Sequence, residues 1–323
     1  MAPESPARRE FPEAKDLRTY LAAAEIVLAL AGWALGLLGA LTGREPLATY
    51  LYLFAWWPYI FFLDGLLFFI KGESWVLNRP GNFFCTLPWS VTFWLIFEAF
   101  NLVLQNWRYA GMVPQWWARW PGYVLAFATV LPGVLLTARV LEALGAWGKA
   151  RGRPLELGPW PAWSLLLGTA CVVLPLAVPH LAFPLIWLAL ISLLDPVCLL
   201  LGGESLLARF AAGERRQVLC LLAAGLVCGF WWELWNYPAT SHWVYSLPAF
   251  NFWKVFQMPL LGYLGFLPFA LECRVMYNFI QALEAAVLKT PKSRGLALLC
   301  QVAFWVLMFA ALDAWTVISY QSW

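Results

Sequence analysis

Hydrophobic and polar positions along the chain come in long blocks, with no sustained two-residue alternation. Apolar runs of roughly 20 residues, the length of a membrane-crossing helix, are separated by short segments rich in Pro, Gly and charged residues. Backbone groups in hydrocarbon must be hydrogen-bonded within their own segment, so runs without alternation predict helices. We predict nine spans, at residues 20–42, 48–70, 84–105, 121–146, 161–180, 183–202, 217–236, 257–286 and 296–318.

Composition agrees with a membrane protein. Of the 323 residues, 62% are hydrophobic and 12% are charged, and the mean hydropathy is +0.69. A soluble domain carries about 25% charged residues, so this chain has too few to cover a hydrated surface. The first apolar run is too long for a signal-peptide core, and we expect it to be retained as a helix.

Lysine and arginine are distributed unevenly between alternate loops. With the N-terminus inside, the outer loops hold only Arg44, Arg108, Arg119 and Lys254. The inner segments hold fifteen: Arg8, Arg9, Lys15, Arg18, Lys71, Arg79, Lys149, Arg151, Arg153, Arg209, Arg215, Arg216, Lys289, Lys292 and Arg294. Positive residues accumulate in cytoplasmic loops. The pattern therefore predicts the inner (cytoplasmic) membrane of a bacterium, with the N-terminus cytoplasmic and the C-terminus outside.

The chain also contains an internal repeat, whose offset grows from 131 to 136 residues along the series. The matching residues are Asp64 and Asp195, Gly72-Glu73-Ser74 and Gly203-Glu204-Ser205, Glu98 and Glu233, Asn101 and Asn236, Trp107 and Trp243, and Tyr109 and Tyr245. Each unit holds four spans, so the two units should run in parallel about an axis near the membrane normal.

The predicted fold is thus all-α and polytopic, with two parallel four-helix repeats and one further helix. The predicted divisions are a cytoplasmic tail (1–19), the first repeat (20–147), a cytoplasmic linker (148–160), the second repeat (161–286) and an extra C-terminal transmembrane helix (287–323).

Two carboxyls near the outer ends of their spans are the first candidates for chemistry, because a charge at membrane depth is costly. Glu98 and Glu233 each precede an asparagine, Asn101 or Asn236, by three residues, which places both side chains on one helix face. The pairs are candidates for acid–base catalysis or for binding a proton or cation. The alternative is a hydrogen-bonded clasp that fixes helix packing.

A second polar site is predicted near the inner ends of two spans. Asp64 and Asp195 are each followed, nine residues later, by Glu73 or Glu204, with Arg79 and Arg209 close in sequence as partners. One interpretation is a set of buried or interfacial salt bridges that hold the repeat. The other is a gate that faces inward.

Three further ionisable residues are predicted to have no counterpart in the first repeat: Glu272, Arg274 and Asp313. Glu272 and Asp313 are predicted to join Glu233 on the outer side as further catalytic residues, with Arg274 neutralising one of them. On this interpretation the second half holds the site and the first is a scaffold.

The outer loops, 106–120 and 237–256, are rich in aromatic residues. Trp and Tyr favour the headgroup depth, which suggests an aromatic belt. Alternatively, the loops fold back as lids over a pocket between the repeats. In that case the substrate-lining residues are Trp107, Tyr109, His242, Trp243 and Tyr245, with His242 either a proton shuttle or a loop hydrogen-bond donor.

No cofactor and no metal site are predicted. Two histidines in outer segments do not suit a haem or a His-rich metal site, and the seven cysteines form no CxxC pair. Nucleotide-binding and hydrolase motifs are missing, and no basic arm suggests nucleic acid. The expected partners are membrane lipids and an apolar or cationic small molecule.

One stretch of the first unit carries a family resemblance. Leu63-Asp64, Trp75-x-x-Asn78, Gly81, Leu87-Pro88 and Phe97-Glu98 resemble the small membrane domain of carotenoid (lycopene) cyclases. That resemblance implies a duplicated helical fold and intramembrane acids acting on an isoprenoid. Trp89-Ser90 stands where the cyclases have paired acids, so no catalytic role is transferred. The duplicated Trp-Glu-x-x-Asn unit is also similar to uncharacterised bacterial multipass proteins, which implies no activity.

Three function classes remain open from the sequence. The first is an intramembrane enzyme that acts on a lipid or isoprenoid with Glu98 or Glu233 as acid or base. The second is a transporter of protons, small molecules or lipids that uses the interface between repeats. The third is a structural subunit that holds a partner by its Trp-rich outer surface. We favour the enzyme.

Overall fold

The computed structural model describes residues 12–248 and 251–321. Within these ranges, nine helical segments are long and apolar enough to cross a membrane: Asp16–Thr42, Leu51–Lys71, Pro80–Leu104, Trp116–Ala143, Trp160–Ala177, Pro179–Leu200, Arg216–Asn236, Leu260–Ala286 and Pro291–Thr316. The predicted all-α, multispanning fold is confirmed. Residues 1–11 of the predicted tail lie outside the described residues, and the remainder of that tail is helical.

The elements of the first half are α1 (Pro12–Thr42), α2 (Leu51–Lys71), α3 (Trp75–Asn78), α4 (Pro80–Leu104), β1 (Trp107–Ala110), α5 (Trp116–Phe127) and α6 (Val130–Ala143). Those of the second half are α7 (Trp160–Ala177), α8 (Pro179–Ala182), η1 (Phe183–Leu188), α9 (Ala189–Leu200), α10 (Leu206–Ala211), α11 (Arg216–Asn236), β2 (His242–Tyr245), β3 (Lys254–Val255), β4 (Met258–Pro259), η2 (Leu260–Gly265) and α12 (Phe266–Ala286). The chain ends with α13 (Pro291–Ala311) and η3 (Leu312–Thr316).

Helix ends follow local sequence signals. Gly72 ends α2 in the left-handed conformation, which glycine adopts without steric cost, and its N–H donates to the carbonyl of Phe68 at 2.7 Å. Thr290 caps α13 through a reciprocal hydrogen-bond pair with Ser293, and Pro291 occupies the first helical position, where its missing N–H costs nothing.

Two spans are interrupted, and polar side chains satisfy the backbone at each break. Ser90 donates to the carbonyl of Phe127 at 2.7 Å and accepts from the N–H of Leu131 at 3.1 Å, across the break between α5 and α6. Glu272 accepts from the N–H of Leu190 at 2.9 Å, where η1 passes into α9. Free backbone groups at membrane depth need such partners.

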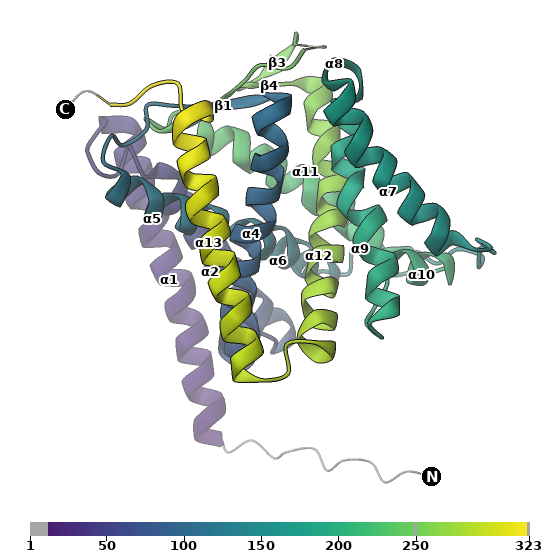
Figure 1. The fold of residues 1–323 in the computed structure, drawn as a ribbon. Coiled ribbons are helices and arrows are strands. Elements are labelled where there is room, and N and C mark those ends of the chain that lie inside the picture. The colour runs from purple at the N-terminus through teal and green to yellow at the C-terminus, as the bar shows by residue number, and fades with distance from the viewer. Residues whose placement is uncertain (1–11, 249–250, 322–323) are drawn as a thin grey trace.

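Four helices, α4, α6, α11 and α12, form the centre of the bundle (Figure 1). Helix α1 packs on α2 at one flank, and α7 packs on α9 at the other, while α13 lies against α4. The N-terminal end of α1 and the C-terminal end of α13 lie at opposite ends of the bundle, as an odd number of spans requires (Figure 1). The strands all lie at one end.

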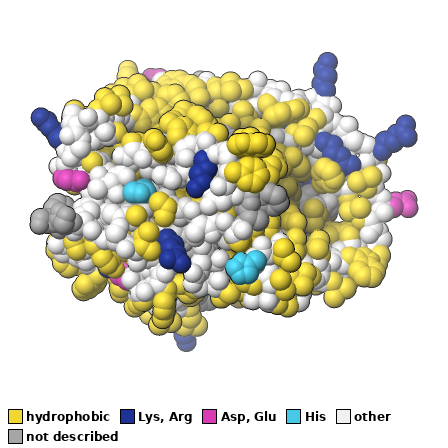
Figure 2. All heavy atoms as spheres, turned by 90° about the horizontal axis from the view of Figure 1, so that it is seen from above, with side chains coloured by type: hydrophobic (Ala, Val, Ile, Leu, Met, Phe, Trp, Pro, Cys, Tyr) yellow, Lys and Arg dark blue, Asp and Glu magenta, His cyan; other side chains and the backbone are white. Residues whose placement is uncertain are grey.

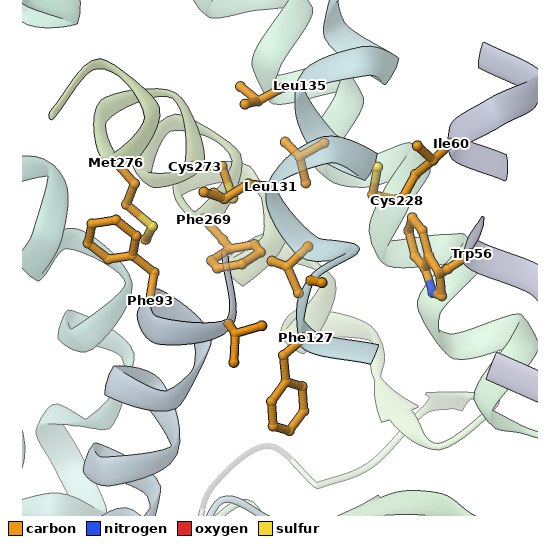
Figure 3. Packing of buried hydrophobic residues seen from close by; sticks show 14 of the residues in the cluster. Trp56, Ile60, Phe93, Phe127, Leu131, Leu135, Cys228, Phe269, Cys273 and Met276 are labelled. Atoms are coloured by element: carbon orange, nitrogen blue, oxygen red, sulfur yellow. The ribbon is translucent and has the colours of Figure 1, made fainter. Parts of the chain in front are cut away.

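The core between the halves is unusually aromatic. Figure 3 shows Leu131, Phe269 and Cys273 packed together, with Met276 beside Phe93. Trp56 is fully buried and packs against Trp232, with ring centroids 4.9 Å apart. Large aromatic rings bury much apolar area, and these residues form one packed, buried layer.

Strands β1 and β2 pair antiparallel, which the sequence did not predict. The pairs are Trp107 with Tyr245, Arg108 with Val244, Tyr109 with Trp243, and Ala110 with His242. Arg108 therefore faces the residue 136 positions later, and the register is symmetric about this pair. The C-terminal segment completes the layer, because Val317 and Tyr320 bridge to Tyr109 and Met112.

Apolar side chains gather along the periphery of this strand-bearing end, and few charged ones appear in its middle (Figure 2). Trp116, Trp117 and Trp253 are among the exposed aromatic residues around it. These residues fit an aromatic belt, in contrast to Trp107 and Tyr109, which are 7% and 8% exposed. The exposed loop residues thus fit the aromatic-belt interpretation, and the buried ones fit the interpretation of loops folded back over a pocket.

Candidate functional site

A cavity of about 200 Å³ lies beneath β1 and β2, between the two halves of the chain. Its wall is largely aromatic, with Tyr52, Trp94, Trp107, Tyr109, Tyr123, Phe127, Trp187, Trp232, Trp243, Tyr245, Phe266 and Phe269 among the lining residues. All five residues predicted from the sequence to line a substrate site, His242 included, line this cavity. A dry cavity of 150 Å³ holds benzene, so this one has room for a small molecule or part of a chain.

Glu98 lies directly behind the cavity wall and is fully buried. Its Oε1 accepts hydrogen bonds from Trp94 Nε1 at 3.0 Å, Trp107 Nε1 at 3.0 Å and the Tyr109 hydroxyl at 2.5 Å. Its Oε2 has no hydrogen-bond partner. One carboxyl oxygen therefore orients three aromatic side chains that line the cavity.

Glu233 is the matching carboxyl on α11 and is also fully buried. Its Oε1 accepts from the Tyr245 hydroxyl at 2.7 Å, and that hydroxyl in turn accepts from Trp243 Nε1 at 2.8 Å. Its Oε2 likewise has no partner. Each glutamate thus contacts the cavity through a tyrosine of its own half, and neither carboxyl lines the cavity itself.

Asn101 and Asn236 hold the start of the two strands. Asn101 donates to the carbonyl of Trp107 at 2.9 Å and accepts from the N–H of Trp107 at 3.2 Å. Asn236 makes the same two bonds to Trp243, both at 2.8 Å. The i to i+3 spacing predicted that Glu and Asn share a face, and in both pairs the amide also holds the backbone of the strand that follows.

Burial and the neighbouring carboxylate raise the pKa of the Tyr109 hydroxyl well above its usual range, and the pKa of Tyr245 is raised in the same way beside Glu233. Both hydroxyls therefore keep their protons at neutral and mildly alkaline pH. Two proton-bearing groups, each backed by a carboxyl with a free oxygen, face one aromatic cavity.

Asp64 and Asp195 cap short helices. Asp195 accepts from the Ser205 hydroxyl at 2.6 Å and from the N–H groups of Leu206 at 2.7 Å and Leu207 at 3.0 Å. Asp64 makes the same three contacts with Ser74, Trp75 and Val76. The expected partners Arg79 and Arg209 form no ion pair with either aspartate, since serine and the N-terminus of a helix already satisfy both carboxylates.

The outlying carboxyls of this second site pair with arginines instead. Glu73 contacts Arg139 at 2.9 Å, and Glu204 contacts Arg274 at 3.1 Å and Arg209 at 3.4 Å. The expectation that Arg274 neutralises Glu272 or Asp313 is therefore wrong. Arg139 and Arg274 make similar contacts, since each pairs with one of these two glutamates.

Glu272 and Asp313 have separate structural partners. Glu272 receives the N–H of Leu190, as described above. Asp313 forms a two-pronged ion pair with Arg119, at 2.8 and 2.5 Å, and accepts from Trp120 Nε1 at 2.8 Å. Neither carboxyl is hydrogen-bonded to Glu233. Arg119 itself lines the cavity, so this pair ties η3, which follows α13, to the cavity rim.

Four residues near these sites were not predicted from the sequence: Ser90, Trp94, Asn106 and Glu25. Ser90 and Trp94 are an ordinary serine and tryptophan in an apolar run, and no local pattern shows what they contact. Asn106 lines the cavity with its Oδ1 buried and without a partner. Glu25 is a lone carboxyl in the first span, a signal that was available; it lines a groove of about 730 Å³ between α1, α2 and α5.

Among the described residues, no group of three or more His, Cys, Asp or Glu side chains is arranged to hold a metal ion. The hydrogen-bonding side chains at the cavity carry hydroxyl, amide, indole, imidazole and guanidinium groups.

The membrane-length helices of the described residues define the chain as an all-α, multispanning membrane protein. Comparison with the models of known families, with curated proteins and with solved structures gives no match. A more specific function must therefore be inferred from the geometry and chemistry of the site.

Proposed function

We propose that this protein binds an apolar lipid, of the isoprenoid type, in the aromatic cavity and acts on it by proton transfer. The observation that carries the proposal is that two Glu–Tyr pairs, Glu98–Tyr109 and Glu233–Tyr245, converge on one cavity from the two halves. The carboxyl starts protonated: as the tyrosine gives its proton to the ligand, the carboxyl passes its own proton to the tyrosine oxygen, and the carboxylate that remains takes a proton back by the same path when the ligand loses one.

The cavity wall fits such a ligand. Aromatic faces bind apolar chains and also stabilise positive charge that develops when a double bond is protonated. Asn106, with its unpaired Oδ1, supplies an acceptor for a hydroxyl at one end of the ligand. Glu98 and Glu233 are catalytic candidates on this account, while Asn101 and Asn236 position the strands.

A route from the bilayer supports a membrane-dissolved ligand. The groove between α1, α2 and α5 shares three lining residues, Tyr50, Leu53 and Gly122, with the aromatic cavity. A Cβ added at Gly122 would lie 3.4 Å from the Tyr50 ring, so these two shared lining residues stand close together at the boundary between the two spaces. A chain that lies in the groove can reach the cavity without entering water.

Equivalent residues of the two halves make the same local contacts. Asp64 and Asp195 each cap a short helix, and Asn101 and Asn236 each hold the start of a strand, which supports a duplication into two parallel four-helix units. The lysine and arginine distribution supports a cytoplasmic N-terminus in a bacterial inner membrane. The aromatic cavity then lies near the outer face.

Untargeted lipid analysis of cells that overproduce the protein tests the activity. We expect a changed lipid in cells with the wild-type chain, and its loss with Glu233→Gln or Tyr245→Phe at an unchanged protein level. Tyr237→Phe is the matched control, because Tyr237 is exposed and does not line the cavity. A lipid profile identical in wild-type and empty-vector cells would refute the activity.

Transport is the second candidate, favoured by a separate observation. A second cavity of about 640 Å³ lies at the opposite end of the bundle, and α4, α6, α11 and α12 line both cavities. Two cavities that share helices and are separated by a packed layer fit alternating access. Purified protein in liposomes should then move protons or a lipid across the membrane. Sealed vesicles with no movement above the protein-free rate would exclude it.

A further inference from the structure

The second cavity has a polar character that the proposed function does not use. It lies between α3, α4, α6, α11 and α12 and is closed on one side by Gly202–Glu204. Three arginines, Arg79, Arg139 and Arg274, line it. Arg139 forms an ion pair with Glu73, and Arg274 forms one with Glu204.

Several donors in this cavity are left without a partner. The Nε–H of Arg274 is buried and unpaired. Asn278 is only 5% exposed and lines the cavity, yet its amide hydrogen-bonds to no other described residue. Arg79 also lines the cavity; it is exposed, and its guanidinium is bonded to none of the described side chains. Leaving a buried donor unpaired costs about 1–3 kcal/mol, so the Arg274 Nε–H points to a missing acceptor, and the Asn278 amide offers a further donor in the same cavity.

Geometry brings two of these donors together. Arg274 and Asn278 lie four residues apart on α12, which places them on one face of the helix, one turn apart. Their neighbours are satisfied, in contrast: Asn82 Oδ1 receives Tyr277 at 2.9 Å, and Asn82 Nδ2 donates to Gln281 at 3.0 Å. The donors of Arg274 and Asn278 therefore lie on one face of α12.

We propose that this cavity binds a phosphate-bearing anion between Arg79, Arg274 and Asn278. A guanidinium fork and an amide match the several acceptor oxygens of a phosphate group. The ionisable lining consists of three arginines and two carboxylates, Glu142 and Glu204, which leaves one net positive charge. The proposal does not depend on the function of the aromatic cavity.

Glu142, another residue of the cavity wall, favours a singly charged phosphodiester over a phosphate dianion. Glu142 lines the cavity on α6, and no described side chain hydrogen-bonds to its carboxylate. Its charge repels a phosphate dianion more than a phosphodiester, which carries one charge. A phospholipid headgroup such as phosphatidylglycerol is therefore expected to bind more tightly than inorganic phosphate, and Glu142→Gln should improve the binding of inorganic phosphate.

Binding to the purified full-length chain in neutral detergent, followed by native mass spectrometry, tests the proposal. The probes are short-chain phosphatidylglycerol and inorganic phosphate. Arg274→Gln should weaken phosphatidylglycerol binding about tenfold or more, because a hydrogen bond to a charged group contributes about 1.5–3 kcal/mol. Arg151→Gln, on an exposed linker arginine outside the cavity, is the control and should leave binding unchanged.

A second variant keeps the test decisive if Arg274→Gln folds poorly. Asn278→Leu replaces an unpaired buried amide with an apolar side chain of similar size, so it should fold at least as stably while binding several-fold more weakly. Tighter binding of inorganic phosphate than of the lipid would support the site with a soluble ligand. Equal binding by wild type, Asn278→Leu and Arg274→Gln would overturn the proposal, as would no binding of either probe.

Discussion

Glu98 and Glu233 make comparable contacts near the same cavity, but they accept different numbers of hydrogen bonds. Glu98 accepts hydrogen bonds from three buried donors, and Glu233 accepts one. Replacing either residue with leucine removes a buried carboxyl, whose desolvation cost is similar at the two sites. The difference between the two substitutions therefore isolates the donors that lose their acceptor.

The magnitude follows from that difference. Glu98→Leu strands two more donors than Glu233→Leu does, since three minus one is two. Hydrogen bonds within membrane proteins contribute about 0.6 kcal/mol on average and up to about 1.7 kcal/mol. Glu98→Leu should thus lower the free energy of unfolding by about 1–3 kcal/mol more than Glu233→Leu.

Unfolding by SDS in mixed micelles, followed by far-UV circular dichroism, measures both variants against the wild type. Glu156→Leu, on an exposed linker residue, controls for the loss of a carboxylate. Equal losses at Glu98 and Glu233, or a larger loss at Glu233, would refute the assigned hydrogen bonds.

Further predictions concern the capping, ion-pair and tyrosine groups. Asp195→Ala and Asp64→Ala should each destabilise the fold by about 1–3 kcal/mol in the same assay, because each removes the same three bonds; a loss at only one site would contradict the matched caps. Asp313→Asn should cost roughly 3 kcal/mol and speed proteolysis of the C-terminal segment, since it breaks the pair with Arg119; an unchanged cleavage rate would count against this tie. The thermal midpoint should fall as pH rises above about 10, because unfolded tyrosine ionises before Tyr109 does, and the fall should be smaller in Tyr109→Phe.

The fold was largely predictable because long apolar runs have few alternatives in a membrane. Every predicted span corresponds to a segment long and apolar enough to cross it. The interruptions were not predicted. The break between α5 and α6 depends on Ser90, from a different helix, whose hydroxyl satisfies both sides of the break. Such a contact between distant segments leaves no local pattern.

The candidate site was predicted in part. The spacing of Glu98 and Asn101 located them on one face, and the aromatic loop residues do line a cavity. The pairing of β1 with β2 was missed because two four-residue strands, far apart in sequence, have no hairpin signal. Partners of charged residues were missed for a similar reason: Arg119 lies 194 positions from Asp313.

The central claim is that the aromatic cavity holds an apolar ligand. Its most direct test is the amount of lipid that co-purifies with the chain, measured by mass spectrometry, for Ala126→Phe against Leu226→Phe. Ala126 lines the cavity, and Leu226 lies exposed on α11, so only the first substitution fills the space. We predict that Ala126→Phe loses one bound lipid species that both the wild type and Leu226→Phe retain. The same bound lipids in all three proteins would contradict the account.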